Sequence, residues 1–260
     1  MEDVDSSDTE LVRGFTPVFS GHGSFSPQRG IPAMRNSAWR ALILILVLAA
    51  ASFPVQAATS FADAEKEVVA AGKTLDTFVA DKDMEWFRGH AKDAKGLFIC
   101  SKVVKAGFII GGSGGRCVFV AKQGGMWNGP AFYTVGTASA GFQAGVQDSE
   151  IIGLVMSQKA IDSLLSDQFK AGGEASVAAG PVGVGTKTTP GADIIYYSRA
   201  KGLYGGVDVS GASIKPSEDY NKAFYGKAVS PMDIIVHGVA HVPSATPALL
   251  TKVEKLYAGR

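Results

Sequence analysis

The sequence predicts an α+β domain in which a glycine-rich, mainly antiparallel or barrel-like sheet packs against several amphipathic helices. Three observations support this prediction. The 260-residue chain is 46% hydrophobic, which is enough for a substantial core. Apolar residues recur at helical spacing from Phe61 to Phe78. Twelve of the 32 glycines fall between Gly96 and Gly145, where they separate short β-branched and aromatic runs, as is typical of hairpins.

The N-terminal part of the chain is predicted to precede the folded domain. Residues 34–57 are typical of a secretory signal peptide, because arginines precede an apolar run and small residues precede a cleavage site. The apolar run, Ala41 to Phe53, is shorter than the roughly 20 residues that span a bilayer. Residues 1–33 are polar and aperiodic, and they are interpreted as a disordered extension ahead of a start at Met34. A single domain is expected over residues 58–260.

Helical spacing recurs in several segments. The first, from Phe61 to Phe78, has an acidic polar face, so packing on the domain is favoured over a membrane-surface role, which would require lysine and arginine. The last begins at Ser244 or Thr246, either of which can cap it. The other helical segments are expected at residues 81–94, 158–169 and, as a short helix or turn, 215–225.

Short apolar runs between glycines are typical of strands. The glycine run from Gly111 to Gly115 is interpreted as a turn between two of them. The strands are expected at residues 97–100, 107–110, 117–121, 131–135, 145–156, 175–185, 194–199 and 202–209.

Positive charge is concentrated in the glycine-rich stretch. No Asp or Glu occurs from Lys95 to Gly145, and aromatic residues such as Trp127 are interleaved with the cations. This combination suits an anionic surface such as phospholipid headgroups. The alternative is a solvated strand face whose lysines only discourage edge pairing. The cations are Lys95, Lys102, Lys105, Arg116 and Lys122.

Other features limit the possible chemistry. A net charge of +1 and the signal peptide argue against a nucleic-acid partner. Ser113 lies in a G-x-S-x-G pattern, but a nucleophile elbow needs a following helix and the residues after it favour a strand. His237 and His241 lack the intervening Glu of a zinc hydrolase. No catalytic residue, metal or cofactor is predicted.

Cys100 and Cys117 are the only cysteines. In an exported protein they would lie in an oxidising compartment, where they could form one disulfide if their strands pair. Isolated buried thiols are the other possibility, because sequence spacing alone fixes no geometry.

Short motifs recur in order through most of residues 68–257. They lie at residues 94–97, 105–108, 111–115, 127–131, 141–145, 180–183, 197–198 and 201–207. Through these motifs the chain resembles the SYLF-domain family, a lipid-binding domain also found in yeast actin-binding proteins. The resemblance implies a non-enzymatic domain that binds membrane lipids, phosphoinositides in eukaryotic members, with actin binding in some.

These observations together predict an exported, periplasmic or envelope-associated, non-enzymatic protein. It would dock on anionic phospholipid membranes through the Lys95 to Lys122 region, with Trp127 or neighbouring aromatic residues at the interface. An envelope protein-interaction module without lipid dependence, with an unidentified protein partner, is the alternative. A hydrolase that uses Ser113 with His237 or His241 is a third hypothesis.

Overall fold

The computed structural model describes residues 58–107, 110–140, 145–185, 191–200, 203–204, 209–238 and 243–259. The predicted extension and signal peptide lie outside these residues. Within them, nine strands form one sheet with the order β5-β9-β3-β2-β1-β4-β7-β6, and β8 pairs with β7. The pairings between these strands are antiparallel except that of β6 with β7. The sheet and the helices around it confirm the predicted α+β class.

Four long strands form the centre of the sheet, and β1 pairs with β2 on one side and β4 on the other. The outer strands are shorter, and each pairs with only part of the length of its neighbour. In chain order the strands are β1 Gly96–Gly107, β2 Ile110–Gln123, β3 Met126–Ala140, β4 Gly145–Val155, β5 Phe169–Lys170, β6 Val177–Ala179, β7 Ile194–Ala200, β8 Leu203–Tyr204 and β9 Ser213–Pro216.

The strand boundaries differ from the sequence prediction at the first hairpin. The strand predicted at 107–110 falls across a boundary, since β1 ends at Gly107, β2 begins at Ile110, and residues 108 and 109 lie outside the described residues. The glycine run from Gly111 to Gly115 is part of β2 and not a turn. Its residues pair with β1 on one side and with β3 on the other. The strand predicted at 175–185 is also shorter, since only Val177–Ala179 pairs with β7.

Close backbone contact explains why glycines occur inside β2. A Cβ atom on Gly115 would collide with the carbonyl oxygen of Lys102 in β1. A Cβ atom on Gly112 would lie 2.9 Å from the carbonyl oxygen of Thr137 in β3. By contrast, the Cβ position of Gly114 is 3.6 Å from the nearest heavy atom, an ordinary contact. These glycines therefore allow close strand approach rather than a reversal of the chain.

The helices confirm most of the helical predictions. The expected helix over 81–94 is split, because a short 3₁₀ turn, η1, precedes α3. No helix in the described parts of the chain is long and apolar enough to cross a bilayer. The described helical segments are α2 Phe61–Ala80, η1 Lys82–Met84, α3 Glu85–Ala91, α4 Gln158–Leu165, α5 Glu218–Tyr225, the π-helical η2 Asp233–His237 and α6 Ala245–Tyr257.

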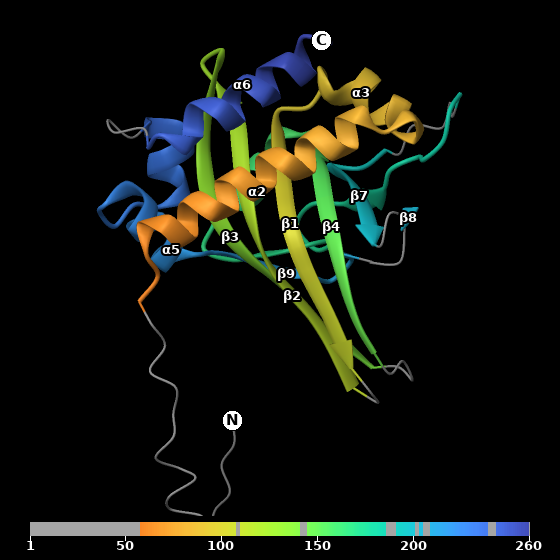
Figure 1. Ribbon diagram of the computed structural model, residues 1–260, viewed down its shortest axis with the longest axis horizontal. Helices are drawn as coiled ribbons and strands as arrows, with labels where there is room; N and C mark the ends of the chain where they lie inside the picture. The colour runs from red at the N-terminus through yellow and green to blue at the C-terminus, as the bar shows by residue number, and fades with distance from the viewer. Residues whose placement is uncertain are drawn as a thin grey trace, which may run out of the picture. The chain divides into compact units, whose positions relative to one another are not determined.

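Helix α2 is fixed both by its own sequence and by the sheet. Ser60 and Asp63 form a reciprocal capping box at its N-terminus. Its buried side, which includes Val68, Leu75 and Phe78, packs on the sheet. Figure 1 shows α2 crossing in front of strands β1 to β4, with α6 alongside it. The first and last described helices therefore share one layer.

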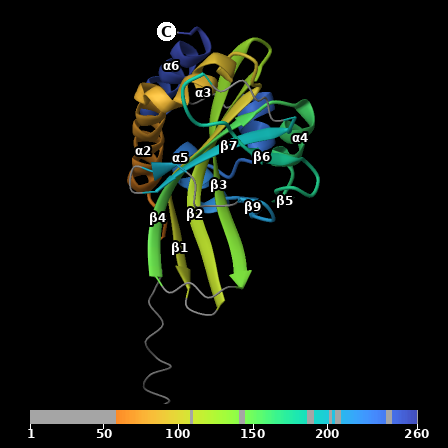
Figure 2. The ribbon, with the colours of Figure 1, turned by 90° about the vertical axis from the view of Figure 1, so that its right-hand side faces the viewer.

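The opposite face of the sheet is covered by α4 and by the segments that carry β5 and β6 (Figure 2). Phe98, Phe119 and Tyr133 pack together on this face, with ring centroids 5.6–6.3 Å apart. The Tyr133 hydroxyl donates to the carbonyl oxygen of Leu164 at the end of α4, at 2.6 Å. Burial raises the pKa of Tyr133 above its ordinary value. The core thus lies on both faces of the sheet.

A half-buried polar cluster connects α2 to the sheet. Thr74 of α2 donates a hydrogen bond of 2.8 Å to Glu150 of β4. The other carboxylate oxygen of Glu150 accepts from the guanidinium of Arg199 in β7. That guanidinium also lies 5.5 Å from the centre of the Phe78 ring. The cluster therefore joins β4, β7 and α2 through one carboxylate.

Replacing Arg199 with methionine is expected to lower the free energy of unfolding by about 2 kcal/mol, because Glu150 would remain half-buried without its cation. Urea denaturation measures this change. Lys102→Met is the matched control, since Lys102 and Asp148 form an exposed pair with 64% and 58% of their side chains accessible. It should cost about 0.5 kcal/mol or less. Equal losses in the two variants would contradict the prediction.

Candidate functional site

The structure distributes the five predicted cations over different parts of the sheet. Lys102 and Arg116 lie directly opposite each other in β1 and β2 and therefore share a face. This is the face that α2 and α5 cover, because Arg116 lies over the ring of Tyr220 in α5. Lys105 lies opposite Ser113, three residues further along β1, and so it points to the other face. The acid-free stretch of sequence therefore does not form one continuous patch.

Two of the cations interact with groups outside that stretch. The Lys102 ammonium lies 3.2 Å from the carboxylate of Asp148 in β4. The Arg116 guanidinium lies 4.2 Å from the centre of the Tyr220 ring. It also contributes to lowering the pKa of Asp219. The positive charges of Lys102 and Arg116 are therefore partly balanced by these neighbouring groups.

Lys95 and Lys122 are brought together at one end of the sheet. Both are exposed, and the backbone amide of Lys122 donates to the carbonyl oxygen of Lys95 at 2.9 Å. The β2–β3 hairpin continues from Lys122 through two glycines with positive φ to Met126, which is 69% exposed. We call Lys95, Lys122, Met126 and the turn between β2 and β3 the hairpin end; Figure 1 shows it at the same end of the domain as the C-terminus of α6. None of the ion pairs found among the described residues includes Lys95, Lys105 or Lys122.

Trp127 occupies the core instead of an exposed interface. It is 8% exposed, and its ring packs edge-on against Tyr257 of α6 with centroids 4.3 Å apart. The Tyr257 hydroxyl in turn donates to the carbonyl oxygen of Gly96 at 3.3 Å. Trp127 therefore packs inside the domain, next to the β2–β3 hairpin. The exposed apolar side chain near Lys95 and Lys122 is that of Met126.

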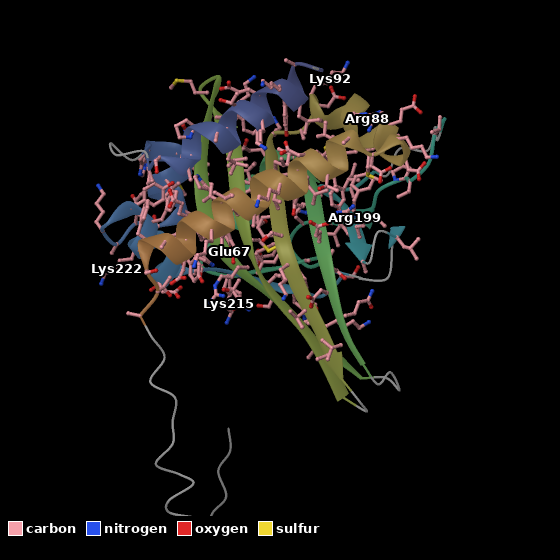
Figure 3. The ribbon with its side chains drawn as sticks, viewed as in Figure 1. Glu67, Arg88, Lys92, Arg199, Lys215 and Lys222 are labelled. Atoms are coloured by element: carbon pink, nitrogen blue, oxygen red, sulfur yellow. A yellow bond between two sulfur atoms is a disulfide. The ribbon has the colours of Figure 1, made fainter. Side chains whose placement is uncertain are left out.

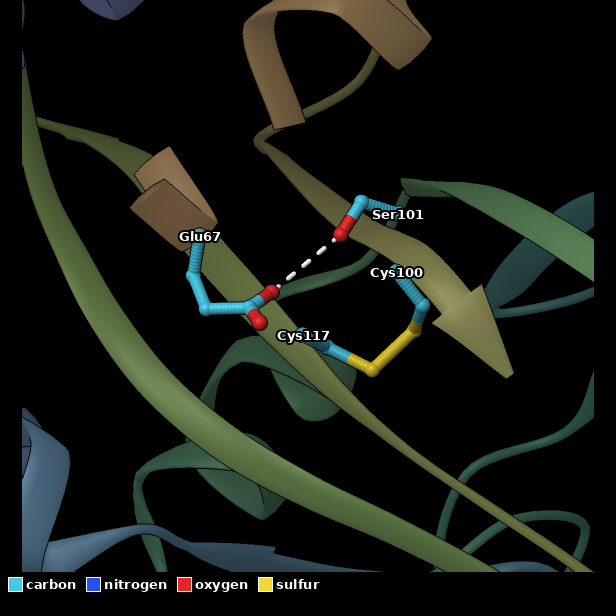
Figure 4. The surroundings of a disulfide bond; sticks show 4 residues. All are labelled: Glu67, Cys100, Ser101 and Cys117. Atoms are coloured by element: carbon cyan, nitrogen blue, oxygen red, sulfur yellow. Dashed lines mark hydrogen bonds between the residues drawn. A yellow bond between two sulfur atoms is a disulfide. The ribbon is translucent and has the colours of Figure 1, made fainter. Parts of the chain in front are cut away.

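The two cysteines form a disulfide between β1 and β2. Both side chains are almost completely buried, with 1% and 2% of Cys100 and Cys117 exposed. The bond lies where the pairing of β1 with β2 shifts register between Ile99 and Lys102. Next to it, Ser101 donates a hydrogen bond of 3.2 Å to Glu67 of α2 (Figure 4). The disulfide therefore links the two central strands on the face that α4 covers, where Cys100 lies near Phe98 and Leu164.

Ser113 and His237, the described side chains considered for catalysis, each have a polar neighbour of their own. Ser113 lies inside β2, where its hydroxyl is 2.7 Å from that of Thr137 in β3. His237 is 3.4 Å from Asp233 within η2, and His241 lies outside the described residues. Among the residues that the structure describes, no group of three or more His, Cys, Asp or Glu side chains is placed to hold a metal ion.

A cleft that the sequence analysis did not predict lies between β9 and α5. It has a volume of about 720 Å³, and its walls are the end of β9, the first turns of α5, residues 228–231 and Asp167. We call it the β9–α5 cleft. Lys215 and Lys222, two of its lining residues, are labelled in Figure 3. Most of its lining lies in one stretch of the chain, residues 215–231, but no sequence motif indicated that this stretch folds around a cleft together with Asp167.

Two of the side chains that line this cleft, the buried Asn221 and the exposed Asp219, are held by hydrogen bonds. The buried Asn221 side chain accepts a hydrogen bond from the backbone amide of Phe132 at 2.9 Å. Asp219 accepts from the hydroxyls of Thr59 and Ser217 at 2.7 and 2.8 Å. Burial alone would raise the pKa of Asp219, but these hydrogen bonds outweigh it and hold the pKa below its ordinary value. Asp219 is therefore charged at neutral pH, and its carboxylate already accepts hydrogen bonds from Thr59 and Ser217.

The described residues form an α+β domain with a cleft and an exposed hairpin end. Residues 136–256 match the model of a family described as Ysc84, the Las17-binding protein actin regulator. This match and the relatives named for YSC84 support the SYLF family, as the motifs in the sequence indicated. Its relatives are named for binding and regulation, which supports a non-enzymatic binding role.

Three relatives illustrate the extent of the similarity. Protein YSC84 of Saccharomyces cerevisiae is 34% identical over 171 residues, which is 63% of this chain and 36% of that protein. LAS seventeen-binding protein 3 of the same yeast is 31% identical over 164 residues, 60% of this chain and 36% of that protein. The human SH3 domain-containing YSC84-like protein 1 is 28% identical over 148 residues, 55% of this chain and 43% of that protein. The matched region thus spans less than half the length of each of these relatives.

Proposed function

We propose that the chain is an exported, non-enzymatic protein that docks on anionic phospholipid membranes through the hairpin end. The observation that carries this proposal is the position of Lys95 and Lys122, which are exposed, unpaired with any described carboxylate, and adjacent to the exposed Met126. Each lysine near an anionic bilayer contributes about 1 kcal/mol, and insertion of an apolar side chain adds to this. The resulting binding is weak and reversible.

The disulfide supports the exported location. Disulfides persist in oxidising compartments, and Cys100 and Cys117 are bonded in the fold. The signal-peptide pattern at residues 34–57 supports the same location. A periplasmic or envelope-associated protein would meet anionic phospholipid at a membrane surface.

Vesicle co-sedimentation tests the docking surface. The protein is expected to sediment with vesicles of phosphatidylglycerol and phosphatidylcholine, and to remain in solution with phosphatidylcholine alone. In the double variant Lys95→Glu and Lys122→Glu, affinity for the anionic vesicles should fall by at least about tenfold, since two attractive charges become repulsive. Raising the salt concentration should weaken the binding of the unchanged protein.

The matched control reverses two lysines of α2, Lys66→Glu and Lys73→Glu. Both are exposed and lie outside the hairpin end. The control has the same net charge as the test variant, so it separates a local effect from a change in total charge. The proposal fails if the two double variants lose affinity equally, or if neutral and anionic vesicles bind the unchanged protein to the same extent.

The names of the yeast relatives favour a second candidate function. Las17-binding proteins are named for a protein partner, so the SYLF domain of this chain would serve as a protein-interaction module. A stoichiometric protein partner that is captured equally in the presence and absence of vesicles, together with no vesicle binding, would favour this function over membrane docking.

A further inference from the structure

The β9–α5 cleft brings together charges of both signs. Lys215 and Lys222 supply two ammonium groups, and Asp167 and Glu218 supply two carboxylates. All four side chains are exposed, and none of them forms an ion pair within 4.0 Å with another described residue. In contrast to Asp219, these groups have no partner among the described residues. Their hydrogen-bonding capacity is directed to solvent or to a ligand.

The fold places one charge of each sign on each wall. Phe169 of β5 lies opposite Ile214 of β9, so Asp167 lies near the end of β9, where Lys215 is found. On the other wall, Glu218 and Lys222 are four residues apart on α5, which puts them on the same side of that helix. A ligand in the cleft would therefore meet both an ammonium and a carboxylate on either side.

The presence of both positive and negative groups in the cleft limits the chemical class of ligand that it can bind. The two carboxylates, together with that of Asp219, disfavour a polyanion, and the lysines disfavour a simple cation. Two lysines provide point-charge donors that suit a phosphate, and two carboxylates accept hydrogen bonds from a primary ammonium. A quaternary ammonium is bound preferentially by aromatic rings, and no aromatic side chain is among the described residues that line the cleft.

We propose that the β9–α5 cleft binds a zwitterionic ligand that carries a phosphate and a primary amine, of the phosphoethanolamine type. In this proposal the lysines of the cleft bind the phosphate, and its carboxylates bind the amine. The volume of about 720 Å³ is in the range of small-molecule sites and leaves space for a glycerol group attached to the phosphate. This site is separate from the hairpin end, so its function does not depend on membrane docking by Lys95 and Lys122.

Titration calorimetry with the purified full chain tests the proposal. The probes are glycerophosphoethanolamine, glycerophosphocholine, inorganic phosphate and ethanolamine. Glycerophosphoethanolamine should bind at least about tenfold more tightly than each of the other three, because only it satisfies both pairs of charges. Lys222→Met and Glu218→Gln should each reduce its affinity by about tenfold or more, since each removes a charged hydrogen-bonding partner.

Lys227→Met is the control variant, because Lys227 is exposed on the same segment but does not line the cleft. It should leave the affinity for glycerophosphoethanolamine unchanged. Thermal unfolding of all three variants should match that of the unchanged protein, since the substituted side chains are exposed. Equal binding of inorganic phosphate, equal binding of the choline compound, or no binding of the ethanolamine compound would overturn the proposal.

Vesicles distinguish the two sources of this headgroup. A lipid ligand predicts that the unchanged protein sediments more with phosphatidylethanolamine vesicles than with phosphatidylcholine vesicles, and that Glu218→Gln abolishes the difference. A free ligand predicts binding in calorimetry with no difference between the vesicles. In both cases the double variant Lys95→Glu and Lys122→Glu should retain its affinity for glycerophosphoethanolamine, which separates this site from the docking surface.

Discussion

Replacing Gly115 with alanine is expected to lower the free energy of unfolding by about 3 kcal/mol and Tm by about 9 °C. The added Cβ would overlap the carbonyl oxygen of Lys102 and lie 3.0 Å from the Cα of Val103, both in the backbone of β1. A side chain could rotate away from such a contact, but a paired strand cannot. The two central strands would have to separate locally, and hydrogen bonds between them would weaken. Calorimetric unfolding measures the loss.

Gly114→Ala is the control for this substitution. It changes the neighbouring residue of the same strand, where the new Cβ would lie 3.6 Å from the carbonyl oxygen of Val135. Stability should stay within about 1 kcal/mol of the unchanged protein, with a small gain possible because alanine restricts the unfolded chain. If both variants were equally destabilised, the loss would reflect glycine content in general and not close strand approach at Gly115.

Removing the disulfide is expected to have an effect of similar size. The double variant Cys100→Ala and Cys117→Ala should lose about 3 kcal/mol of stability, because the bond closes a loop between residues 17 apart in sequence and restricts the unfolded chain. Guanidinium denaturation under oxidising conditions measures the change.

A reductant provides the comparison for the cysteine variants. Dithiothreitol should destabilise the unchanged protein by nearly the same amount and leave the double variant unaffected. A double variant with the same denaturation midpoint as the oxidised protein would show that the bond adds no stability. A loss that occurs in the variant but not on reduction would instead point to packing of the two buried side chains.

The sequence was sufficient to predict the fold class and most helices, because these depend on local patterns. The helix from Phe61 was predicted from its apolar spacing, and the structure adds only its capping residues. The glycine run at Gly111–Gly115 was misinterpreted as a turn. Glycine permits a tight turn and also permits close strand approach, and only the positions of Lys102 and Thr137 on neighbouring strands distinguish the two.

The candidate site was less predictable than the fold. The five cations are close in sequence, but alternation along β1 separates Lys102 from Lys105, and Asp148 of β4 compensates Lys102. Lys95 and Lys122 are far apart in sequence and meet only because β1 and β2 pair along their whole length. The charges of the β9–α5 cleft had no sequence signal, since an isolated Asp or Lys between two elements is typical of any protein surface.

The contact between α2 and α6 has a consequence for how the protein is made. Asp76 of α2 accepts a hydrogen bond from Lys252 of α6, and Glu65 accepts another from Ser244 just before α6. The hydrogen bond between Asp76 and Lys252 joins residues that are 176 apart in the sequence. The helical layer over the sheet is therefore completed only after α6 has been synthesised, and until then α2 lacks these contacts.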